Sequence, residues 1–568
     1  MMDNVIFLIL RRMRRPLITL VVIYAVAIIG LLTIPGRLPD GTPWRMDIFH
    51  AFYFVSFMST TIGFGEVPHE FSDAQRIWVT LVIYVSVIGW LYSIGTLLSL
   101  LQDKAFKQAL TELRFAKHIR KLSEPFYLIC GYGETGGTLA RDMTDRGRHV
   151  VVLDISEDAI NMTKMANLRD DVPALAVDAR IPQALVEAGL ERDQCDGVIA
   201  VTNDSWANLK IALTAKLLNP DTPVVCRAES AEVEANMASF GTDHIIDPFE
   251  TFALHLSTAL QAPCLYLLQQ WLSGHENEML SEPIYPPREG QWILCGYGRF
   301  GKAVYRRLRQ EGIDVVVVEA APELTGRSEG RFIEGVGTEA VTLEQAHVAH
   351  AVGLVAGTDN DVNNLSIIMT AKALNPSLFV ILRQNLAENE RIAHRVGADI
   401  VMYPSSIVAN RIRSLLVTPL LSQFIGLASN QDDAWACRVV SRISGVIGER
   451  APAVWEVTID DEQAHAVYQH IGRGHRPLLH HLLRDPRDRD QRLDCVPLLL
   501  AREQSREAMP SPDTPLRHGD QLLFTGRYRA RRRMEWTLLN EHALAYAMDD
   551  ASDHRTLLGR WFERLGLQ

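Results

Sequence analysis

The sequence predicts two membrane-spanning helices at the start of the chain, then two doubly wound α/β domains in tandem, and finally a smaller α+β region. Two observations carry this prediction. Two long stretches without a charged residue lie within residues 1–103, and one pattern of strands, glycines and helices occurs twice between residues 125 and 430. The chain has 568 residues, so several soluble domains can follow the membrane part.

The two uncharged stretches are long enough to cross a hydrocarbon core. The first runs from Leu17 to Ile34 and stops at Pro35, and the second runs from Ile77 to Gln102. Basic residues flank both outer ends, namely Arg11, Arg12, Arg14, Arg15, Lys104 and Lys107. This excess predicts that both ends lie in the cytoplasm. A cleaved signal peptide is the competing interpretation, but no small-residue cleavage site follows the first stretch and a second span does.

A short apolar stretch between the spans, residues 48–58, leads directly into a glycine-rich loop. A dehydrated potassium ion needs oxygen ligands in place of its water shell, and stacked backbone carbonyls supply them when the backbone alternates in handedness. Gly63 and Gly65 stand at the alternate positions where glycine makes this cheap. We therefore expect a re-entrant pore helix and a K+ selectivity filter formed by Thr60, Thr61, Ile62, Gly63, Phe64 and Gly65.

Two alternatives stay open in this part of the chain. The filter segment could be a glycine-rich turn between apolar helices, and Phe64 lacks the hydroxyl of the more usual tyrosine. In the second span, Gly89 and Gly95 are candidate gating hinges. They could equally be positions where neighbouring helices pack closely.

The composition of the chain argues against several classes of function and structure for its soluble part. The formal net charge of −11 gives no electrostatic case for nucleic-acid binding. Seven cysteines occur without a Cys-x-x-Cys pair, which argues against a zinc site or a disulfide framework and favours a reduced, cytoplasmic bulk. We expect Cys130 and Cys295, at matching strand ends, to be small buried apolar residues.

The soluble part contains an internal repeat. Residues 127–136 return as residues 292–301, and the apolar strand 149–154 returns as 314–319. Residues 198–204 match 353–359, and residues 214–220 match 370–376. Apolar strands that alternate with amphipathic helices predict parallel sheets covered on both faces, hence two Rossmann-like domains.

Each copy carries a Gly-x-Gly-x-x-Gly loop between a strand and a helix. In such a loop the glycines make the turn, clear space for a pyrophosphate and let the helix pack closely. A carboxylate after the second strand, Asp154 or Glu319, can bind the ribose of NAD or ADP. The alternative is that the glycines only preserve the turn. The candidate nucleotide site in the first copy comprises Gly131, Gly133, Glu134, Thr135, Gly136, Asp154, Asp178, Ala179 and Arg227.

The second copy is the weaker candidate. It has lost the aspartate equivalent to Asp178, since it reads Gly-Val-Gly-Thr at 335–338. Arg299, within its loop, could contact a phosphate or take its place. Arg227 and Arg383 occupy equivalent later strands and could contact phosphate or a neighbouring domain, or form surface salt bridges. The second possible site comprises Gly296, Gly298, Arg299, Gly301 and Glu319.

On the filter, the repeat and the tail, the chain resembles prokaryotic two-transmembrane potassium channels with tandem RCK domains (regulators of potassium conductance, related to TrkA-N), of the GsuK type. The resemblance implies a ligand-gated homotetramer in the inner (plasma) membrane, with the N-terminus and the RCK domains cytoplasmic. Four filters form one pore and eight RCK domains form a gating ring. It also implies K+ in the filter, NAD or ADP in an RCK domain, and Ca2+ as a further candidate whose ligands the sequence does not identify. Acidic groups such as Asp243-His244 and residues 359–361 are usually solvated loop residues or caps.

The resemblance also sets the expected domain boundaries. We expect a pore module at 1–103, a linker at 104–124, a first RCK domain at 125–289 and a second at 290–430. Residues 249–272 and 407–425 match the crossover helices that pair RCK domains. Residues 431–530 resemble a TrkA-C subdomain, notably at 515–526, and the C-terminal tail 531–568 has no assignment.

Two other functions would use similar sequence features. An NAD-dependent oxidoreductase would show the glycine loops, but no domain is left for a substrate and no hydride-transfer constellation is apparent, so we expect no enzyme activity. An NAD-binding regulatory subunit of a separate potassium transporter would show the repeat, but would not need the filter loop or two spans. The sequence does not indicate whether the nucleotide opens or closes the pore.

Overall fold

The computed structural model describes residues 2–38, 42–274, 280, 282–448, 450–503 and 505–548. The chain divides into two compact units, Met1–Ser123 and Glu124–Gln568. The expected fold class, a two-span helical module with two Rossmann-like domains and a C-terminal α+β region, is confirmed in both units.

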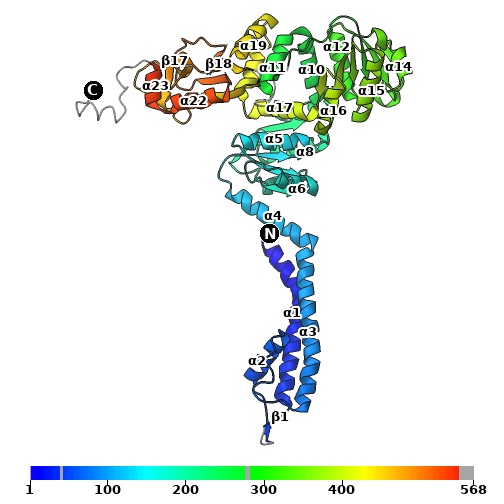
Figure 1. The fold of residues 1–568 in the computed structure, drawn as a ribbon, viewed down its shortest axis with the longest axis vertical. Helices are drawn as coiled ribbons and strands as arrows, with labels where there is room; N and C mark the ends of the chain where they lie inside the picture. The colour runs from blue at the N-terminus through cyan, green and yellow to red at the C-terminus, as the bar shows by residue number, and fades with distance from the viewer. Residues whose placement is uncertain are drawn as a thin grey trace, which may run out of the picture. The chain divides into compact units, whose positions relative to one another are not determined.

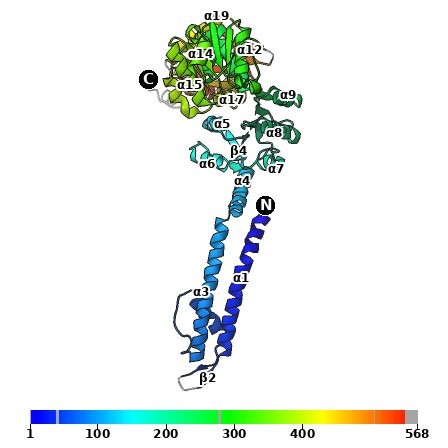
Figure 2. The same ribbon diagram turned by 90° about the vertical axis from the view of Figure 1, so that its right-hand side faces the viewer.

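The first unit is built from helices. They are α1 (Met2–Thr33), α2 (Ile48–Ser59), α3 (Asp73–Gln102) and α4 (Lys104–Lys121), with a small pair of strands β1 (Gly36–Arg37) and β2 (Pro43–Trp44). Helices α1 and α3 lie side by side (Figure 2). Residues Met13–Thr33 and the whole of α3 are long and apolar enough to cross a membrane. Large apolar side chains face outward along both helices, as lipid contact requires.

Local signals in the sequence set the limits of these helices. Helix α2 is capped at its N-terminus by Asp47, whose carboxylate accepts a hydrogen bond from His50 N. Helix α3 starts with a capping box between Ser72 and Gln75, and it stops at Asp103, where the backbone becomes extended. The linker expected at 104–124 is therefore largely the separate helix α4.

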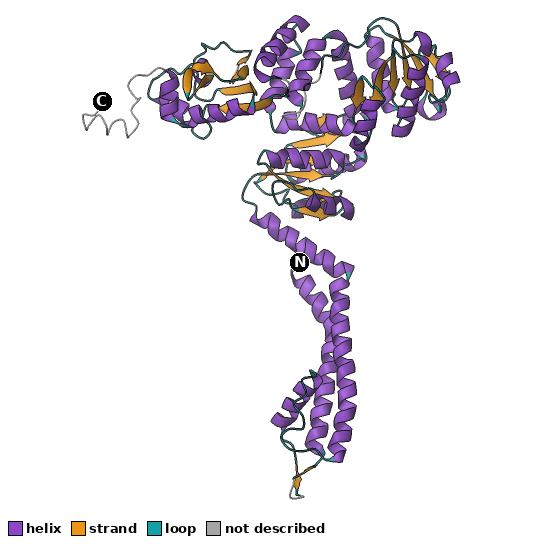
Figure 3. Ribbon diagram, viewed as in Figure 1, coloured by secondary structure: helices purple, strands orange, loops and turns teal. Residues whose placement is uncertain are grey.

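The second unit contains two six-stranded parallel sheets with one topology (Figures 1 and 3). The first has the order β5-β4-β3-β6-β7-β8. Its strands are β3 (Phe126–Cys130), β4 (His149–Asp154), β5 (Ala174–Ala176), β6 (Cys195–Ala200), β7 (Val224–Arg227) and β8 (His244–Ile246). Its helices are α5 (Glu134–Asp145), α6 (Glu157–Met165), α7 (Pro182–Glu187), α8 (Ser205–Leu218) and α9 (Ala231–Ser239). The central strands are buried along their length, because helices cover both faces.

The second sheet repeats this arrangement in the order β11-β10-β9-β12-β13-β14. Its strands are β9 (Gln291–Cys295), β10 (Asp314–Glu319), β11 (Arg331–Glu334), β12 (Gly353–Ala356), β13 (Phe379–Arg383) and β14 (Ile400–Met402). Its helices are α12 (Arg299–Gln310), α13 (Pro322–Thr325), α14 (Ala340–Gln345), α15 (Asp361–Leu374) and α16 (Glu390–Arg395). The shared strand order is what the sequence repeat predicts.

Two crossover arms join the domains by exchanging helices. The first arm is α10 (Pro248–Gln261) and α11 (Pro263–Ser273), and the second is α17 (Pro404–Leu416) and α18 (Pro419–Ala428). Although α10 follows the first sheet, Phe252 and Leu256 of α10 pack in the core of the second domain with Phe300. In return, Val408 and Ile412 of α17 pack in the core of the first domain. The boundary expected at residue 289 therefore separates the two sheets along the sequence, but each domain core also includes a helix from the other side of this boundary.

The C-terminal region is an antiparallel sheet with helices on both faces. Its strand order is β15-β20-β18-β19, with β15 (Ala453–Thr458), β18 (Cys495–Arg502), β19 (Ser505–Ala508) and β20 (Gln521–Gly526). Helices α11, α18 and α19 (Asp433–Ile447) cover one face. The other face is covered by α20 (His465–Gly472), α21 (Leu479–Leu482), α22 (Tyr528–Leu539) and α23 (Glu541–Met548).

Two features of this region were not expected. The boundary at residue 530 stays a prediction, but Met534, Leu538 and Leu544 are buried in the core of the C-terminal sheet, so packing on this sheet continues at least to α23, which ends at Met548. Residues 549–568 lie outside the described part of the chain. The other is a disulfide between Cys264 and Cys437, since the cysteine spacing argued only against a disulfide framework. Their separation of 173 residues gives no local sequence signal, and only the packing of α11 on α19 brings them together.

Candidate ion filter and nucleotide site

The loop after α2 alternates in backbone handedness. Thr61, Gly63 and Gly65 have φ angles of 65°, 67° and 95°, while the residues between them keep negative φ. A Cβ atom added at Gly63 or Gly65 would meet nothing within 4 Å, so conformation rather than space calls for glycine there. Positive φ at Thr61 was not expected, because threonine carries no sequence signal for it.

Aromatic rings support the loop from one side. The ring of Phe64 packs edge-on against Phe57 at 5.3 Å between centroids, and Phe57 packs against Phe54 at 5.1 Å. At the far end of the loop, the Glu66 carboxylate pairs with Arg76 of α3 at 2.8 Å and accepts a hydrogen bond from Phe71 N. Every residue from Thr60 to Gly65 is exposed in the single chain, which leaves the loop's backbone open on its other side.

The three glycines of the first nucleotide loop have three different environments. Gly131 has φ of 105°, and a Cβ there would lie 2.9 Å from Thr202 N. A Cβ on Gly136 would lie 1.9 Å from the Gly131 carbonyl oxygen, so only glycine lets α5 pack against the turn. A Cβ on Gly133 would meet nothing within 4 Å. These are the three roles that a phosphate-binding turn requires.

A cavity of about 910 Å³ opens over this loop, at the carboxyl ends of the first sheet. That volume lies in the range of small-molecule sites. All the candidate residues of the first copy line it except Gly136, which is buried beneath the turn. Apolar side chains of Ile155, Met162 and Ile211 also line it. The second domain contributes Asn385, Leu386, Pro404 and Ser405 to the lining. None of these seven residues was expected from the sequence.

The carboxylates of the cavity already have partners. Asp154 accepts hydrogen bonds from Tyr132 N at 2.6 Å and Ser156 N at 2.8 Å, so it fixes the glycine loop. Asp178 forms a two-pronged ion pair with Arg180 at 2.8–3.0 Å, and this guanidinium lowers the pKa of Asp178. Thr135 is buried at the start of α5, and Glu134 accepts a hydrogen bond from Ser405 Oγ at 3.2 Å.

The second glycine loop has the same backbone geometry. Gly296 has φ of 96°, and a Cβ on Gly301 would lie 2.0 Å from the Gly296 carbonyl oxygen. Gly298 has open space, as Gly133 does. The Glu319 carboxylate is buried and accepts hydrogen bonds from Tyr297 N at 2.5 Å and Ala321 N at 2.9 Å. None of these residues lines the large cavity.

The arginines distinguish the two copies. Arg383 is 7% exposed, stacks over the rings of Phe249 and Phe300, and pairs with Asp359 at 2.7 Å. Arg227, its equivalent, lines the first cavity and pairs with Glu229 through Nε at 3.0 Å. Arg299 reaches from the second glycine loop to the same Glu229 carboxylate at 2.8 Å. Glu229 therefore lies between two arginines, one from each domain.

The two candidate hinge glycines have different surroundings. Gly89 is buried, and a Cβ there would lie 2.5 Å from Ile23 Cδ1 of α1, so Gly89 lets α1 and α3 approach closely. Gly95 faces open space. Helix α3 is continuous through both positions, so their role as hinges stays a prediction.

The acidic groups considered for calcium are engaged within the protein. Asp243 pairs with Lys216 at 2.7 Å, and Asp359 pairs with Arg383. Asp361 accepts hydrogen bonds from the backbone of Asn385 and Leu386. These contacts are those of loop caps, and none of them gathers carboxylates around a common point.

Comparison with known proteins gives two family matches. The TrkA-N domain model matches residues 127–248 and 292–404, and the ion channel model matches residues 17–103. Potassium channel protein 1 of Methanocaldococcus jannaschii is 26% identical over 266 residues, which cover 46% of this chain and 74% of that protein. A TrkA homologue of the Trk potassium uptake system from Methanothermobacter thermautotrophicus is 30% identical over 163 residues, which cover 28% of this chain and 74% of that protein.

Other relatives are matched over less of their length. The chain spans 35% of a protein of Methanothermus fervidus, with 27% identity, and 62% of probable potassium channel protein 2 of Methanocaldococcus jannaschii, with 24% identity. Among solved structures, the GsuK channel has a TM-score of 0.47 and 16% identity, covering 94% of this chain and 99% of that one. The GsuK channel bound to NAD has a TM-score of 0.46 and 15% identity, covering 96% and 100%.

Proposed function

Because the chain belongs to the family of proteins with TrkA-N domains and carries an ion-channel domain before them, we propose that it is a potassium channel gated by an adenine nucleotide. The observation that carries this proposal is the alternation of positive φ at Thr61, Gly63 and Gly65, directly after α2 and between two candidate spans. Such a backbone turns successive carbonyl oxygens to one side, where they replace the water shell of K+.

The pore needs several copies of the chain. One loop cannot surround an ion, and its outer side is open in the single chain, so we assign the protein to a homotetramer with four filter loops. Apolar side chains at equivalent places in the two RCK domains support assembly of a ring. Trp206 and Leu213 on α8 are 56% and 39% exposed, and Val362 and Met369 on α15 are 72% and 63% exposed. Large exposed apolar side chains seven residues apart lie on one face of a helix, and such faces are typical of protein–protein contacts.

The first RCK domain is the proposed nucleotide site. Gly133 leaves room for a pyrophosphate next to the free amides at the start of α5. Ile155, Met162 and Ile211 offer an apolar surface to an adenine base. The Asp154 carboxylate can accept a hydrogen bond from a ribose hydroxyl with its remaining lone pairs. NAD and ADP share this chemistry.

Gating would follow from the two-domain lining of the cavity. A nucleotide that contacts Asn385 and Ser405 as well as the first glycine loop binds one arrangement of the two domains better than others. Its differential affinity then shifts the equilibrium between closed and open channels. The connection to the pore runs along the chain through α4. We place the protein in a prokaryotic plasma membrane with the N-terminus and RCK domains in the cytoplasm, in keeping with the flanking basic residues.

Potassium flux separates this proposal from the alternatives. The purified full-length protein, reconstituted alone into liposomes, should carry K+ but not Na+, and NAD or ADP should change the rate. A regulatory subunit would bind nucleotide without carrying ions. An oxidoreductase would reduce NAD with a substrate, and absence of flux together with such turnover would contradict the channel.

A further inference from the structure

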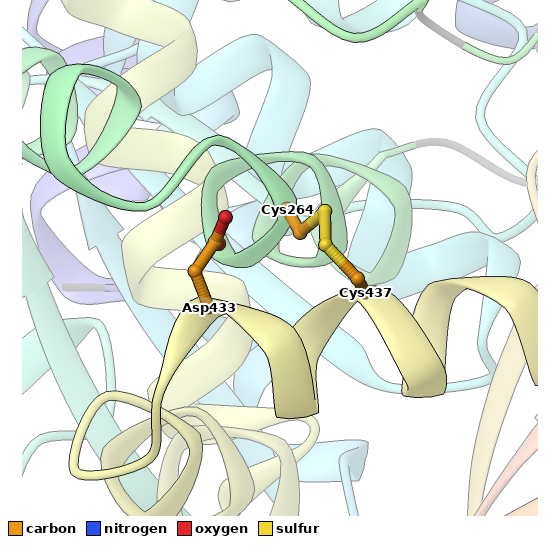
Figure 4. A group of neighbouring side chains, drawn as sticks. All are labelled: Cys264, Asp433 and Cys437. Carbon is orange, nitrogen blue, oxygen red and sulfur yellow. A yellow bond between two sulfur atoms is a disulfide. The ribbon is translucent and has the colours of Figure 1, made fainter.

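Two cysteines of the second unit differ from the other five. Cys130, Cys195, Cys226, Cys295 and Cys495 are free and buried, and burial raises the pKa of each thiol, for example that of Cys195 to about 11 and that of Cys295 to about 12. Such thiols stay protonated and unreactive. Cys264 and Cys437 are only partly buried and are joined by a disulfide, with their Cα atoms 5.0 Å apart (Figure 4).

The bond lies where α11 meets α19. Cys264 is the second residue of α11, directly after Pro263. Asp433, one turn before Cys437 on α19, accepts a hydrogen bond from Leu265 N at 3.1 Å. Leu265 also packs with Ala428 and Ala436 beside the bond. These contacts hold α11 on α19 without the sulfur–sulfur bond, so both redox states can fold.

The disulfide links the two crossover arms covalently, and in this sense we call it a clasp. Cys264 belongs to the first arm, and Cys437 lies on the helix that continues the second arm. The two cysteines are 173 residues apart in the sequence. The part of the chain between them contains the whole second sheet, and also Asn385 and Ser405, which line the nucleotide cavity. A closed bond restricts how far the arms can move apart, and an open bond removes that restriction.

We propose that Cys264 and Cys437 form a reversible redox-modification site, which exchanges with dithiols and disulfides and clasps the two crossover arms when it is oxidised. This inference goes beyond the channel function. It rests on the proposed cytoplasmic location in one respect, because a disulfide in a reducing compartment is usually transient or redox-sensing rather than a permanent staple.

The exchange follows ordinary thiol chemistry. A thiolate of an external dithiol attacks one sulfur of the bond, the sulfur–sulfur bond breaks, and the other cysteine leaves as a thiolate that takes a proton from solvent. The second thiol of the reductant then displaces the first cysteine. Two electrons pass to the protein, and one disulfide forms in the reductant for the one lost here.

The test uses the full-length protein in detergent, without nucleotide. After mild treatment with dithiothreitol, differential alkylation and mass spectrometry should find Cys264 and Cys437 labelled in the folded protein, and the five buried cysteines labelled only after denaturation. Glutathione disulfide should restore the bond. In hydrogen exchange, α11 and α19 should exchange several-fold faster in the reduced protein, and the Cys264→Ser/Cys437→Ser variant should match the reduced protein under both conditions.

Three results would overturn the inference. A bond that resists dithiothreitol until the protein unfolds would make it a permanent staple. Equal hydrogen exchange in both states would remove the clasp. Stoichiometric zinc binding by the reduced protein, lost in Asp433→Asn, would make the group a metal site, since its ligand atoms lie within 4.8 Å of one another. None of these readouts needs nucleotide binding or ion flux, so failure of the channel proposal would be seen separately.

Discussion

At the scale of a single residue, Gly63 adopts a backbone conformation in the filter loop that other residues reach only at a cost in free energy. Its φ of 67° lies where an alanine costs about 1–2 kcal/mol, and the cost recurs in each copy around the pore. We expect Gly63→Ala to abolish K+ selectivity while the RCK domains stay folded. Liposome flux with K+ and Na+ gradients measures this, and Gly95→Ala, at an exposed helical glycine, is the control that should keep selectivity. Unchanged selectivity in Gly63→Ala would contradict the filter assignment.

Gly133 allows a test of the nucleotide site with a matched control. A side chain there has free space in the absence of ligand, so Gly133→Val should fold normally and occupy the room left for the pyrophosphate. We expect a loss of nucleotide affinity of at least tenfold, which corresponds to about 1.4 kcal/mol. Gly298→Val makes the same change in the second loop and should leave the affinity unchanged. Isothermal calorimetry on the detergent-solubilised protein decides between the loops, and the reverse pattern would move the site to the second domain.

Asp154 and Glu319 extend this comparison to the ribose end. Asp154→Ala should weaken nucleotide binding by about 1–3 kcal/mol, because it removes a charged acceptor for the ribose hydroxyls and the hydrogen bond from Tyr132 N that holds the glycine loop. Glu319→Ala should matter less for the same ligand, although its carboxylate holds the second loop in the same way. Calorimetry of the two variants beside the wild type would refute the ranking if only Glu319→Ala eliminates binding.

The sequence identified residues whose signal is local. The glycine pattern predicted the turns at Gly131 and Gly296, and their φ angles of 105° and 96° agree with that prediction. The ion pair between Arg299 and Glu229 could not be predicted from the sequence, because the two residues belong to different domains and meet only where those domains pack together. For the same reason the sequence did not indicate Asn385 and Ser405 in the cavity lining.

At the scale of elements, strand β15 carries a titratable carboxylate, Glu456, that faces the start of α18. Burial raises the pKa of Glu456 to about 7 from 4.5, and its Oε1 accepts a hydrogen bond from Leu420 N at 2.8 Å. Because the folded pKa is raised, the stability from this group is fully present below about pH 4.5 and is lost as pH rises towards about 7. The loss leaves a charged carboxylate between α18 and β15.

Glu456→Gln should remove this pH dependence, since glutamine keeps an acceptor for Leu420 N and cannot ionise. Relative to wild type, the variant should gain stability between pH 5 and pH 8, on the order of 1–2 kcal/mol after allowance for partial exposure to solvent. Thermal unfolding of both proteins at each pH measures the difference, in which other titrating groups cancel. A difference that does not change with pH would show that Glu456 is ionised throughout.

The helices show what periodicity can and cannot predict. Apolar runs and caps placed α2, α3 and the strands of both sheets. The exchange of α10 and α17 between the two domains could not be predicted in this way. An amphipathic pattern shows that a helix has an apolar face, but many different neighbours could cover that face. The packing of α22 and α23 on the C-terminal sheet was not predicted for a related reason. Only a few buried side chains, such as Met534 and Leu544, tie these helices to the sheet, and several arginines stand near the start of α22.

At the scale of the whole molecule, the account requires assembly. The exposed filter loop and the apolar positions Trp206 and Val362 should be covered by other copies. Native mass spectrometry of the detergent-solubilised protein should therefore give four chains. Trp206→Glu should weaken the association of the soluble domains, because it places a charge on an apolar contact, while Glu232→Lys on α9 serves as a charge-changing control. A monomer or dimer that still conducts would contradict the tetramer.

The central claim is that this one chain forms a K+-selective pore that responds to an adenine nucleotide. The most direct test is ion flux in liposomes that contain only the purified protein, measured with K+ or Na+ gradients and with NAD or ADP on the side of the RCK domains. We expect K+ flux, negligible Na+ flux, and a change in rate with nucleotide that Gly133→Val abolishes. Equal permeability to K+ and Na+, or no flux under any of these conditions from a correctly folded protein, would contradict it.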